Sequence, residues 1–259
     1  KETHITTAAP NKQPMLAYPR IIAHRGGGAL APENTLTGMH IAQRMGCLGV
    51  EFDVALTADG VPILMHDETL ERTTSGTGFV AKTKAAEIAK LDAGGKHHYA
   101  FAVSPVPTFQ AALQTCTELG LWMNIEIKPT PGTEVETGRI VASVAAAHLA
   151  SHPDAAIVCS SFSSAALQQT MHIAPTIPRA LLIESIPANW QSALDLCGAA
   201  ALHTDAKNLD FSQLAAVCNS RISVACYTVN HRATADKLFA AGVRAIFTDR
   251  LDLWQPGEM

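Results

Sequence analysis

Two acidic residues are spaced in the sequence as metal ligands often are. Glu51 and Asp53 alternate within the apolar run at residues 49–55, so in an extended strand both point to one face and Phe52 points to the other. Carboxylates on the inner face of a strand are costly to bury unless a cation neutralises them. We therefore predict a shared metal; the alternative is a strand whose acidic face meets solvent.

A third acid and a lysine repeat this pattern further along the chain. Glu126 and Lys128 share a face of the run W-M-N-I-E-I-K, with isoleucines on the opposite face. The acid can complete a metal site and the lysine can contact a phosphate oxygen, although a surface ion pair would have the same spacing. Because the three acids offer only oxygen atoms, we expect one divalent cation, Mg²⁺ or Ca²⁺, with Mn²⁺ also possible.

Two histidines and an arginine follow other apolar runs. His24 and Arg25 precede three glycines, which indicate either a loop that approaches a ligand closely or a plain turn. His66 follows residues 61–65, which return from the hairpin signal A-D-G and bring it level with the first two acids. Both histidines can transfer protons near neutral pH, and the metal, the arginine and the lysine can stabilise charge on a phosphoryl group. These residues together predict phosphodiester cleavage.

The elements that must position these residues alternate regularly between strand and helix. We expect strands beginning near residues 21, 49, 121, 155, 179, 200, 221 and 244, with residues 61–66 as a hairpin extension. Eight parallel strands predict an α/β fold, a (β/α)8 TIM-type barrel, with its chemistry at the carboxyl ends of the strands. Phe162, His203 and Tyr227 also fall at such ends, and we expect them to bind substrate.

The rest of the chain is expected to add small features to a single domain. Residues 68–107 lose regular periodicity and contain glycines and polar residues, so we predict a small inserted cap over the site. Residues 1–19 carry three prolines and no secretory apolar core, and we expect a flexible leader or an expression remnant. The barrel domain is predicted to span residues 20–259.

Composition argues against several classes of function. The 259 residues are 47% hydrophobic and 16% charged, which suits one substantial core. A formal net charge of −4 argues against nucleic-acid binding, and no apolar run reaches the ~20 residues of a membrane span. The six scattered cysteines indicate reduced, buried thiols. We expect a cytoplasmic monomer or homodimer with a small-molecule substrate and no stable membrane association.

Six sequence blocks resemble the glycerophosphodiester phosphodiesterases. They are H-R-G with A-P-E-N-T (residues 24–35), G-V-E-F-D-V-A-L-T-A-D-G-V-P-I-L-M-H-D-E-T-L-E-R-T-T (49–74), I-E-I-K-P (125–129), S-S-F (160–162), Y-T-V-N (227–230) and T-D-R (248–250). The resemblance covers residues 20–253, and the compact chain is most similar to the cytosolic bacterial type. At Tyr227 the chain departs from the tryptophan that is common in the family.

The resemblance implies a role for most candidate residues. It implies Glu51, Asp53 and Glu126 as metal ligands, His24 and His66 as the acid–base pair, and Arg25 and Lys128 as phosphate contacts. Glu33 and Asn34 are expected to brace their loop. Phe162, His203 and Tyr227 remain candidates for contact with the alcohol.

The implied reaction is hydrolysis of a glycerophosphodiester, such as glycerophosphocholine or glycerophosphoethanolamine, to glycerol 3-phosphate and an alcohol. The neighbouring glycerol hydroxyl attacks phosphorus with His24 as base and His66 as acid, and water then opens the cyclic phosphate. One alternative is a lysophospholipase D-like or phosphoinositide phosphodiesterase acting on membrane lipid. Another is a barrel that binds a phosphate ligand without hydrolysing it.

Overall fold

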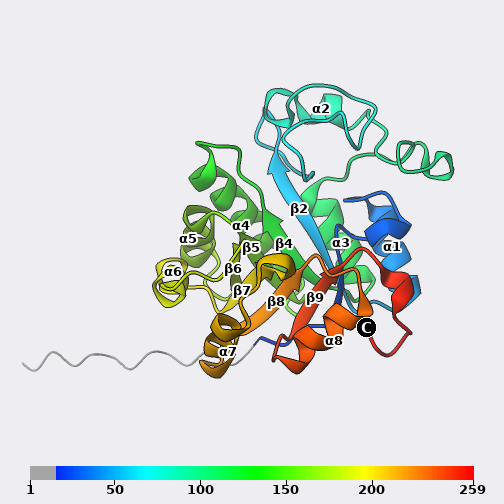
Figure 1. Cartoon of the computed structure of the whole chain (residues 1–259). Helices are drawn as coiled ribbons and strands as arrows, with labels where there is room; N and C mark the ends of the chain where they lie inside the picture. The colour runs from blue at the N-terminus through cyan, green and yellow to red at the C-terminus, as the bar shows by residue number, and fades with distance from the viewer. Residues whose placement is uncertain (1–15) are drawn as a thin grey trace, which may run out of the picture.

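Eight parallel strands close into a barrel in the computed structural model, which describes residues 16–259 (Figure 1). β1 pairs with both β9 and β2, which closes the ring, and the predicted (β/α)8 TIM-type fold is therefore confirmed. The barrel strands are β1 (Ile21–Ala23), β2 (Gly49–Leu56), β4 (Trp122–Ile127), β5 (Ile157–Ser161), β6 (Arg179–Ile183), β7 (Ala201–Asp205), β8 (Ser223–Tyr227) and β9 (Ala245–Thr248).

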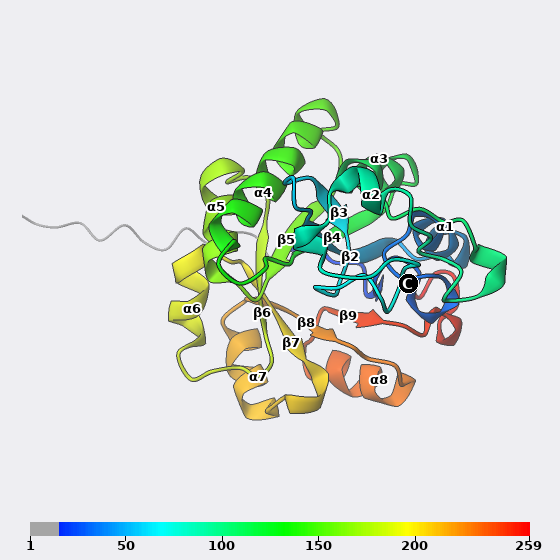
Figure 2. The same cartoon turned by 90° about the horizontal axis from the view of Figure 1, so that it is seen from above.

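Helices cover the outer face of the barrel (Figure 2). Phe52 of β2 points outward and packs on Phe109 of α3, with ring centroids 6.3 Å apart and both side chains fully buried. This outward packing leaves the alternate positions of β2 to face the barrel interior. The covering helices are α1 (Leu36–Met45), α3 (Phe109–Glu118), α4 (Glu134–Ser151), α5 (Ser164–Ile173), α6 (Trp190–Cys197), α7 (Phe211–Asn219) and α8 (Arg232–Ala240).

β3 (Pro62–Leu64) precedes the inserted segment and runs antiparallel to the end of β2, as the hairpin signal predicted. Residues 68–107 then contain one short helix, α2 (Ala85–Ile88), and 3₁₀ turns. Apolar side chains, including Leu70, Val80 and Ile88, form a cluster of their own under this segment. In Figure 1 the long strand β2 rises from the barrel to the inserted segment at the top of the molecule. The segment therefore stands at the carboxyl end of the barrel.

Tyr18, which lies before the predicted start of the barrel domain at residue 20, contacts the barrel. Its hydroxyl group forms a 2.9 Å hydrogen bond with Nε2 of His203 on β7, and its ring centroid lies 5.1 Å from that of Trp122. The adjacent interior is lined by small side chains such as Ala201, which leave room for a tyrosine ring. The rest of the predicted leader, residues 1–15, lies outside the described residues.

We expect Tyr18→Ala to lower the free energy of unfolding by about 3 kcal/mol, because it empties a packed site and removes the partner of a buried histidine. Tyr18→Phe removes only the hydroxyl group and should cost about 1 kcal/mol. Urea unfolding measures both effects. Tyr99→Ala is the matched control, since Tyr99 is 83% exposed. A Tyr18→Ala variant as stable as this control would contradict the role of Tyr18 in the barrel.

The state of the cysteines agrees with the expectation of reduced, buried thiols. All six are free thiols, five of them buried, as the sequence predicted. Among residues 16–259, no helix has both the length and the apolar character needed to cross a bilayer.

Candidate active site

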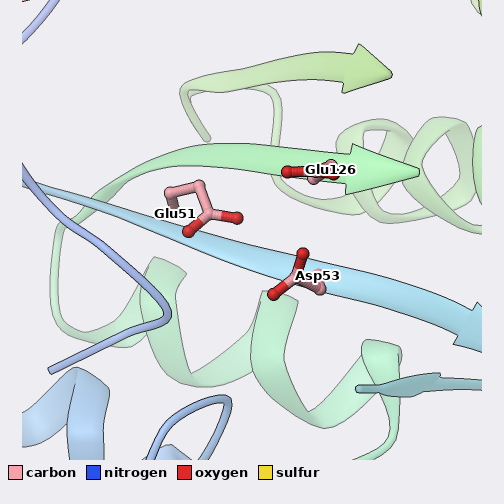
Figure 3. A group of neighbouring side chains, drawn as sticks. All are labelled: Glu51, Asp53 and Glu126. Carbon is pink, nitrogen blue, oxygen red and sulfur yellow. The ribbon is translucent and has the colours of Figure 1, made fainter. Parts of the chain in front are cut away.

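Three carboxylates meet at the carboxyl end of the barrel (Figure 3). Glu51 and Asp53 project from β2, and Glu126 projects from the neighbouring strand β4, where it stands in register with Asp53. One oxygen from each lies within 4.8 Å of the other two. The period of two along both strands thus brings together the three acids that the sequence singled out.

The oxygen atoms of this cluster fit a divalent cation. Oε1 of Glu51 and Oδ1 of Asp53 are buried and have no hydrogen-bond partner. Burial and the charge of Asp53 raise the pKa of both Glu51 and Glu126, because three carboxylates repel one another away from water. A cation bound between them would relieve the repulsion and provide the missing partner, and an oxygen-only set suits Mg²⁺, Ca²⁺ or Mn²⁺.

Two basic residues flank the acids. The Nζ of Lys128 donates a 3.0 Å hydrogen bond to Glu126 and lies 3.7 Å from Oδ1 of Asp53. The guanidinium Nε of Arg25 lies 3.8 Å from Oδ2 of Asp53. The backbone N–H of Arg25 donates a 2.8 Å hydrogen bond to Glu51. The positively charged side chains of Lys128 and Arg25 therefore border the carboxylates, where an anionic ligand would need positive charge.

His24 is oriented by a carboxylate that directly follows the last strand of the barrel. Its Nδ1 forms a 2.8 Å hydrogen bond with Asp249, and its Nε2 lies 3.9 Å from Oε2 of Glu51. Asn230 donates a 2.9 Å hydrogen bond to the other carboxylate oxygen of Asp249. Burial lowers the pKa of His24, but the hydrogen bond to Asp249 and the charge of Glu51 outweigh it and raise the pKa. Since Nδ1 is occupied, Nε2 is the atom left to face the acids.

The glycines after Arg25 allow the first loop to pack against the last. Gly28 has a φ of +57°, and a Cβ added there would lie 2.5 Å from the carbonyl oxygen of Asp249. The N–H of Ala29 donates a 2.7 Å hydrogen bond to that same oxygen. The glycine run therefore permits the close contact that brings Asp249 to His24.

His66 is oriented in the same way by its neighbour in the sequence. Its Nδ1 forms a 2.8 Å hydrogen bond with Asp67. Arg72 donates two hydrogen bonds to Asp67 and two to Glu33, which ties the inserted segment to the loop after β1. Burial lowers the pKa of His66, and the positive charge of Lys128 adds to this effect while Asp53 opposes it. Nε2 of His66 is again the free ring nitrogen.

Asn34 holds Asp53 from the opposite side. Its side-chain amide donates a 2.9 Å hydrogen bond to Oδ2 of Asp53 and accepts a 3.0 Å hydrogen bond from the Asp53 backbone N–H. Thr35 caps α1 by accepting from the N–H of Gly38. Asn34 was expected only to brace its loop, yet it orients a proposed metal ligand directly.

Four supporting residues were not singled out from the sequence as site residues: Asp67, Arg72, Asn230 and Asp249. Each stands in a block that the family resemblance contains. An acid directly after a strand-end histidine, as in H-D, was a usable signal for Asp67. Nothing local connects Asp249 with His24, because the two residues are 225 positions apart.

The candidate residues surround a cavity of about 200 Å³. Phe162 is 52% exposed at its edge, with its ring centroid 6.2 Å from that of Tyr227. His203 lines the same cavity but is fully buried, so it belongs to the inner wall. Asp53 lies just behind this lining. The candidate residues in the lining are His24, Arg25, Glu51, His66, Glu126, Lys128, Phe162, His203 and Tyr227.

Burial lowers the pKa of His203 to about 3 and gives the protein an acid-sensitive group. In the unfolded chain the imidazole of His203 is protonated below pH ~6.5, whereas in the native protein it stays neutral to a much lower pH. The free energy of unfolding therefore decreases as the pH drops, by up to about 1.4 kcal/mol per pH unit. We expect the free energy of unfolding to decrease less between pH 6.5 and pH 4.5 in His203→Gln than in the wild type. Urea titrations at several pH values measure it, and equal losses in both proteins would contradict the prediction.

A TIM-type barrel that carries an acidic cluster, two carboxylate-oriented histidines and two flanking cations defines a barrel hydrolase acting on phosphate esters. The sequence profile of the glycerophosphoryl diester phosphodiesterase family matches residues 24–253, and the chain belongs to this family. It is therefore an enzyme, a phosphoric diester hydrolase, and the predicted resemblance is confirmed. Membership in a family of hydrolases also argues against the non-hydrolytic binder.

Similar proteins cover nearly the whole chain. A glycerophosphodiester phosphodiesterase of Caldanaerobacter subterraneus subsp. tengcongensis is 32% identical over 88% of this chain and 93% of its own length. One from Bacillus subtilis is 31% identical over 95% of this chain and 89% of its own. The structure of an Oleispira antarctica phosphodiesterase, in complex with the product sn-glycerol-3-phosphate, superimposes with a TM-score of 0.84 at 35% identity. It covers 89% of this chain and 93% of that one.

Proposed function

We propose that this enzyme hydrolyses soluble glycerophosphodiesters, such as glycerophosphocholine and glycerophosphoethanolamine, to glycerol 3-phosphate and an alcohol. The observation that carries the proposal is the placement of two histidines, each with a carboxylate on Nδ1, beside three converging acids. The product held by the Oleispira antarctica relative supports glycerol 3-phosphate as the product here.

Glu51, Asp53 and Glu126 are the proposed ligands of one divalent cation. When bound, the cation supplies Lewis-acid stabilisation of the charge on the phosphoryl oxygens. The three carboxylates with Arg25 and Lys128 carry one net negative charge when all are ionised, which a divalent cation converts to one net positive charge. That charge complements the single negative charge of a phosphodiester.

The two histidines are proposed to move the protons. Nε2 of His24 accepts the proton of the glycerol hydroxyl group as its oxygen attacks phosphorus, and Nε2 of His66 donates a proton to the departing alcohol oxygen. In the second stage water attacks the cyclic phosphate, giving its proton to His66, while His24 returns a proton to the glycerol oxygen. Each histidine thereby regains its starting protonation state. Arg25 and Lys128 hold the phosphate oxygens throughout.

The surroundings of the histidines support these roles once the site is loaded. The charge of Glu51 raises the pKa of His24, so neutralising Glu51 with a bound cation favours the neutral imidazole that a base requires. The pKa of His66 is lowered by burial and by Lys128, and the negative charge of a bound diester opposes this by favouring the imidazolium that an acid requires. Binding thus shifts each histidine toward its proposed starting form.

The test is release of glycerol 3-phosphate from glycerophosphocholine and glycerophosphoethanolamine with added Mg²⁺, with added Ca²⁺ and after chelation. We expect release that depends on the metal. A folded, metal-bound protein that releases nothing from any soluble diester would reject the proposal.

One observation favours a second candidate, action on a lipid at a membrane surface. Phe79, Tyr99 and Val103 of the inserted segment are exposed, at 48, 83 and 88%. Exposed apolar side chains near a site can contact a lipid surface. Comparison of lysophospholipid in vesicles with soluble glycerophosphodiesters separates the two candidates, because the second requires faster turnover on vesicles and a loss on replacing Tyr99 and Val103 by serine.

A further inference from the structure

A second cavity, of about 420 Å³, lies directly beside the catalytic cavity. The two cavities share four lining residues, His66, Glu126, Lys128 and Phe162. We call the second cavity the alcohol groove and define it by Glu68 and Glu134 together with the four shared residues. Its outer walls come from the inserted segment, the loop before α4 and the turn before α5.

The shared residues indicate which cavity would hold each ester arm of a bound diester. A diester whose phosphate lies beside Lys128 and Glu126 has one ester arm in the inner cavity and the other in the alcohol groove. The inner cavity contains His24, the proposed base for the glycerol hydroxyl, whereas the groove does not. His66, the proposed acid for the departing alcohol, lines both. The alcohol therefore occupies the groove, and this assignment rests on the proposed function.

The groove is acidic and has an exposed aromatic ring. Among the described residues, no basic group forms an ion pair with Glu68 or Glu134, whereas Lys128, which also lines the groove, is paired with Glu126. The N–H of Gly132 donates a 3.1 Å hydrogen bond to Oε1 of Glu134. Phe162, 52% exposed, stands between the two cavities. Carboxylates beside an open aromatic face are the surroundings that bind an organic ammonium group.

We propose that the alcohol groove selects diesters whose leaving alcohol carries a cationic ammonium group, with Glu68, Glu134 and Phe162 as the recognising side chains. Choline and ethanolamine have this chemistry, and neutral or anionic alcohols lack it. Selection arises in the transition state as well as on binding, because the ammonium group remains close to both carboxylates while the ester bond breaks.

The test compares two substrates of the same shape. Glycerophosphocholine and the glycerophosphodiester of 3,3-dimethylbutanol differ only in that a quaternary carbon replaces the quaternary nitrogen. We expect the wild-type enzyme to favour the choline diester by about tenfold in kcat/KM, and Glu68→Gln/Glu134→Gln to reduce that ratio to about two. Glu136→Gln, on the exposed side of the same helix α4, is the matched control and should retain the wild-type ratio.

Each outcome bears on the proposal. A ratio that collapses in the double variant but not in the control supports it, and a smaller ratio at high salt supports it further. A wild-type ratio near one, or a double variant that keeps the wild-type ratio, overturns the groove assignment while hydrolysis itself persists. Absence of hydrolysis with both substrates overturns the proposed reaction, and the groove assignment with it.

Discussion

We expect His66→Gln to lower kcat for glycerophosphocholine by a factor of about 10²–10⁴, because glutamine cannot protonate the departing alcohol. The defect should largely disappear with glycerol 3-(p-nitrophenyl) phosphate, since p-nitrophenolate departs without a proton. His24→Gln should be as defective on glycerophosphocholine and should remain defective on the activated ester, because the glycerol hydroxyl still needs a base. Initial rates of choline and p-nitrophenol release measure the four combinations.

The control is His98→Gln, at an exposed histidine of the inserted segment, which should retain the wild-type rate on both substrates. Isothermal titration with glycerol 3-phosphate checks that the two site variants still bind the product. Rescue of His24→Gln by the activated ester, with no rescue of His66→Gln, would reverse the assigned roles. Full activity of either variant on glycerophosphocholine would remove that histidine from the mechanism.

Glu51→Gln should abolish most of the activity and yet stabilise the metal-free protein. Glutamine is a poorer ligand than a carboxylate, so we expect glycerol 3-phosphate release to fall at least about 10²-fold. Burial raises the pKa of Glu51, which means that its charged form is costly in the folded protein near pH 7, and glutamine removes this cost. The metal-free variant should therefore melt about 3–6 °C above the metal-free wild type.

Differential scanning calorimetry with and without Mg²⁺ or Ca²⁺ measures the second effect. The wild type should gain thermal stability as the metal concentration rises, because the metal binds only the folded site, and Glu51→Gln should gain much less. Glu136→Gln, outside the site on α4, should behave like the wild type in both respects. An equal metal-induced gain in Glu51→Gln and the wild type would argue against Glu51 as a ligand.

The sequence predicted those parts of the site that depend on one strand at a time. Glu51 and Asp53 share a face because strands have a period of two, and Phe52 packs outward for the same reason. Parallel pairing of β2 with β4 then sets Glu126 level with Asp53. The regular strand–helix alternation likewise sufficed to predict the barrel, since each βα unit leaves its own periodic signal.

The contacts that orient His24 and that place Tyr18 inside the barrel could not be predicted in this way. Asp249 meets His24 only when β9 pairs with β1, and no local pattern records which strand-end acid closes on which histidine. Tyr18 was assigned to a leader because residues 1–19 carry three prolines and no secretory apolar core. Its place depends instead on the small side chains inside the barrel, which are set by strands far along the chain.

Two contacts between distant parts of the sequence also bear on how the enzyme is made. Tyr18 meets His203 across 185 positions and His24 meets Asp249 across 225. On the ribosome, a nascent chain that has not yet exposed β9 has neither a closed barrel nor an oriented His24. Closure of the barrel across such separations is slow because forming non-local contacts costs chain entropy. Until the barrel closes, the incomplete intermediate exposes unpaired strand edges. If His24 acts as proposed, a truncated translation product that ends before Asp249 should not hydrolyse the substrate, and we expect it to be a target of chaperones and proteases.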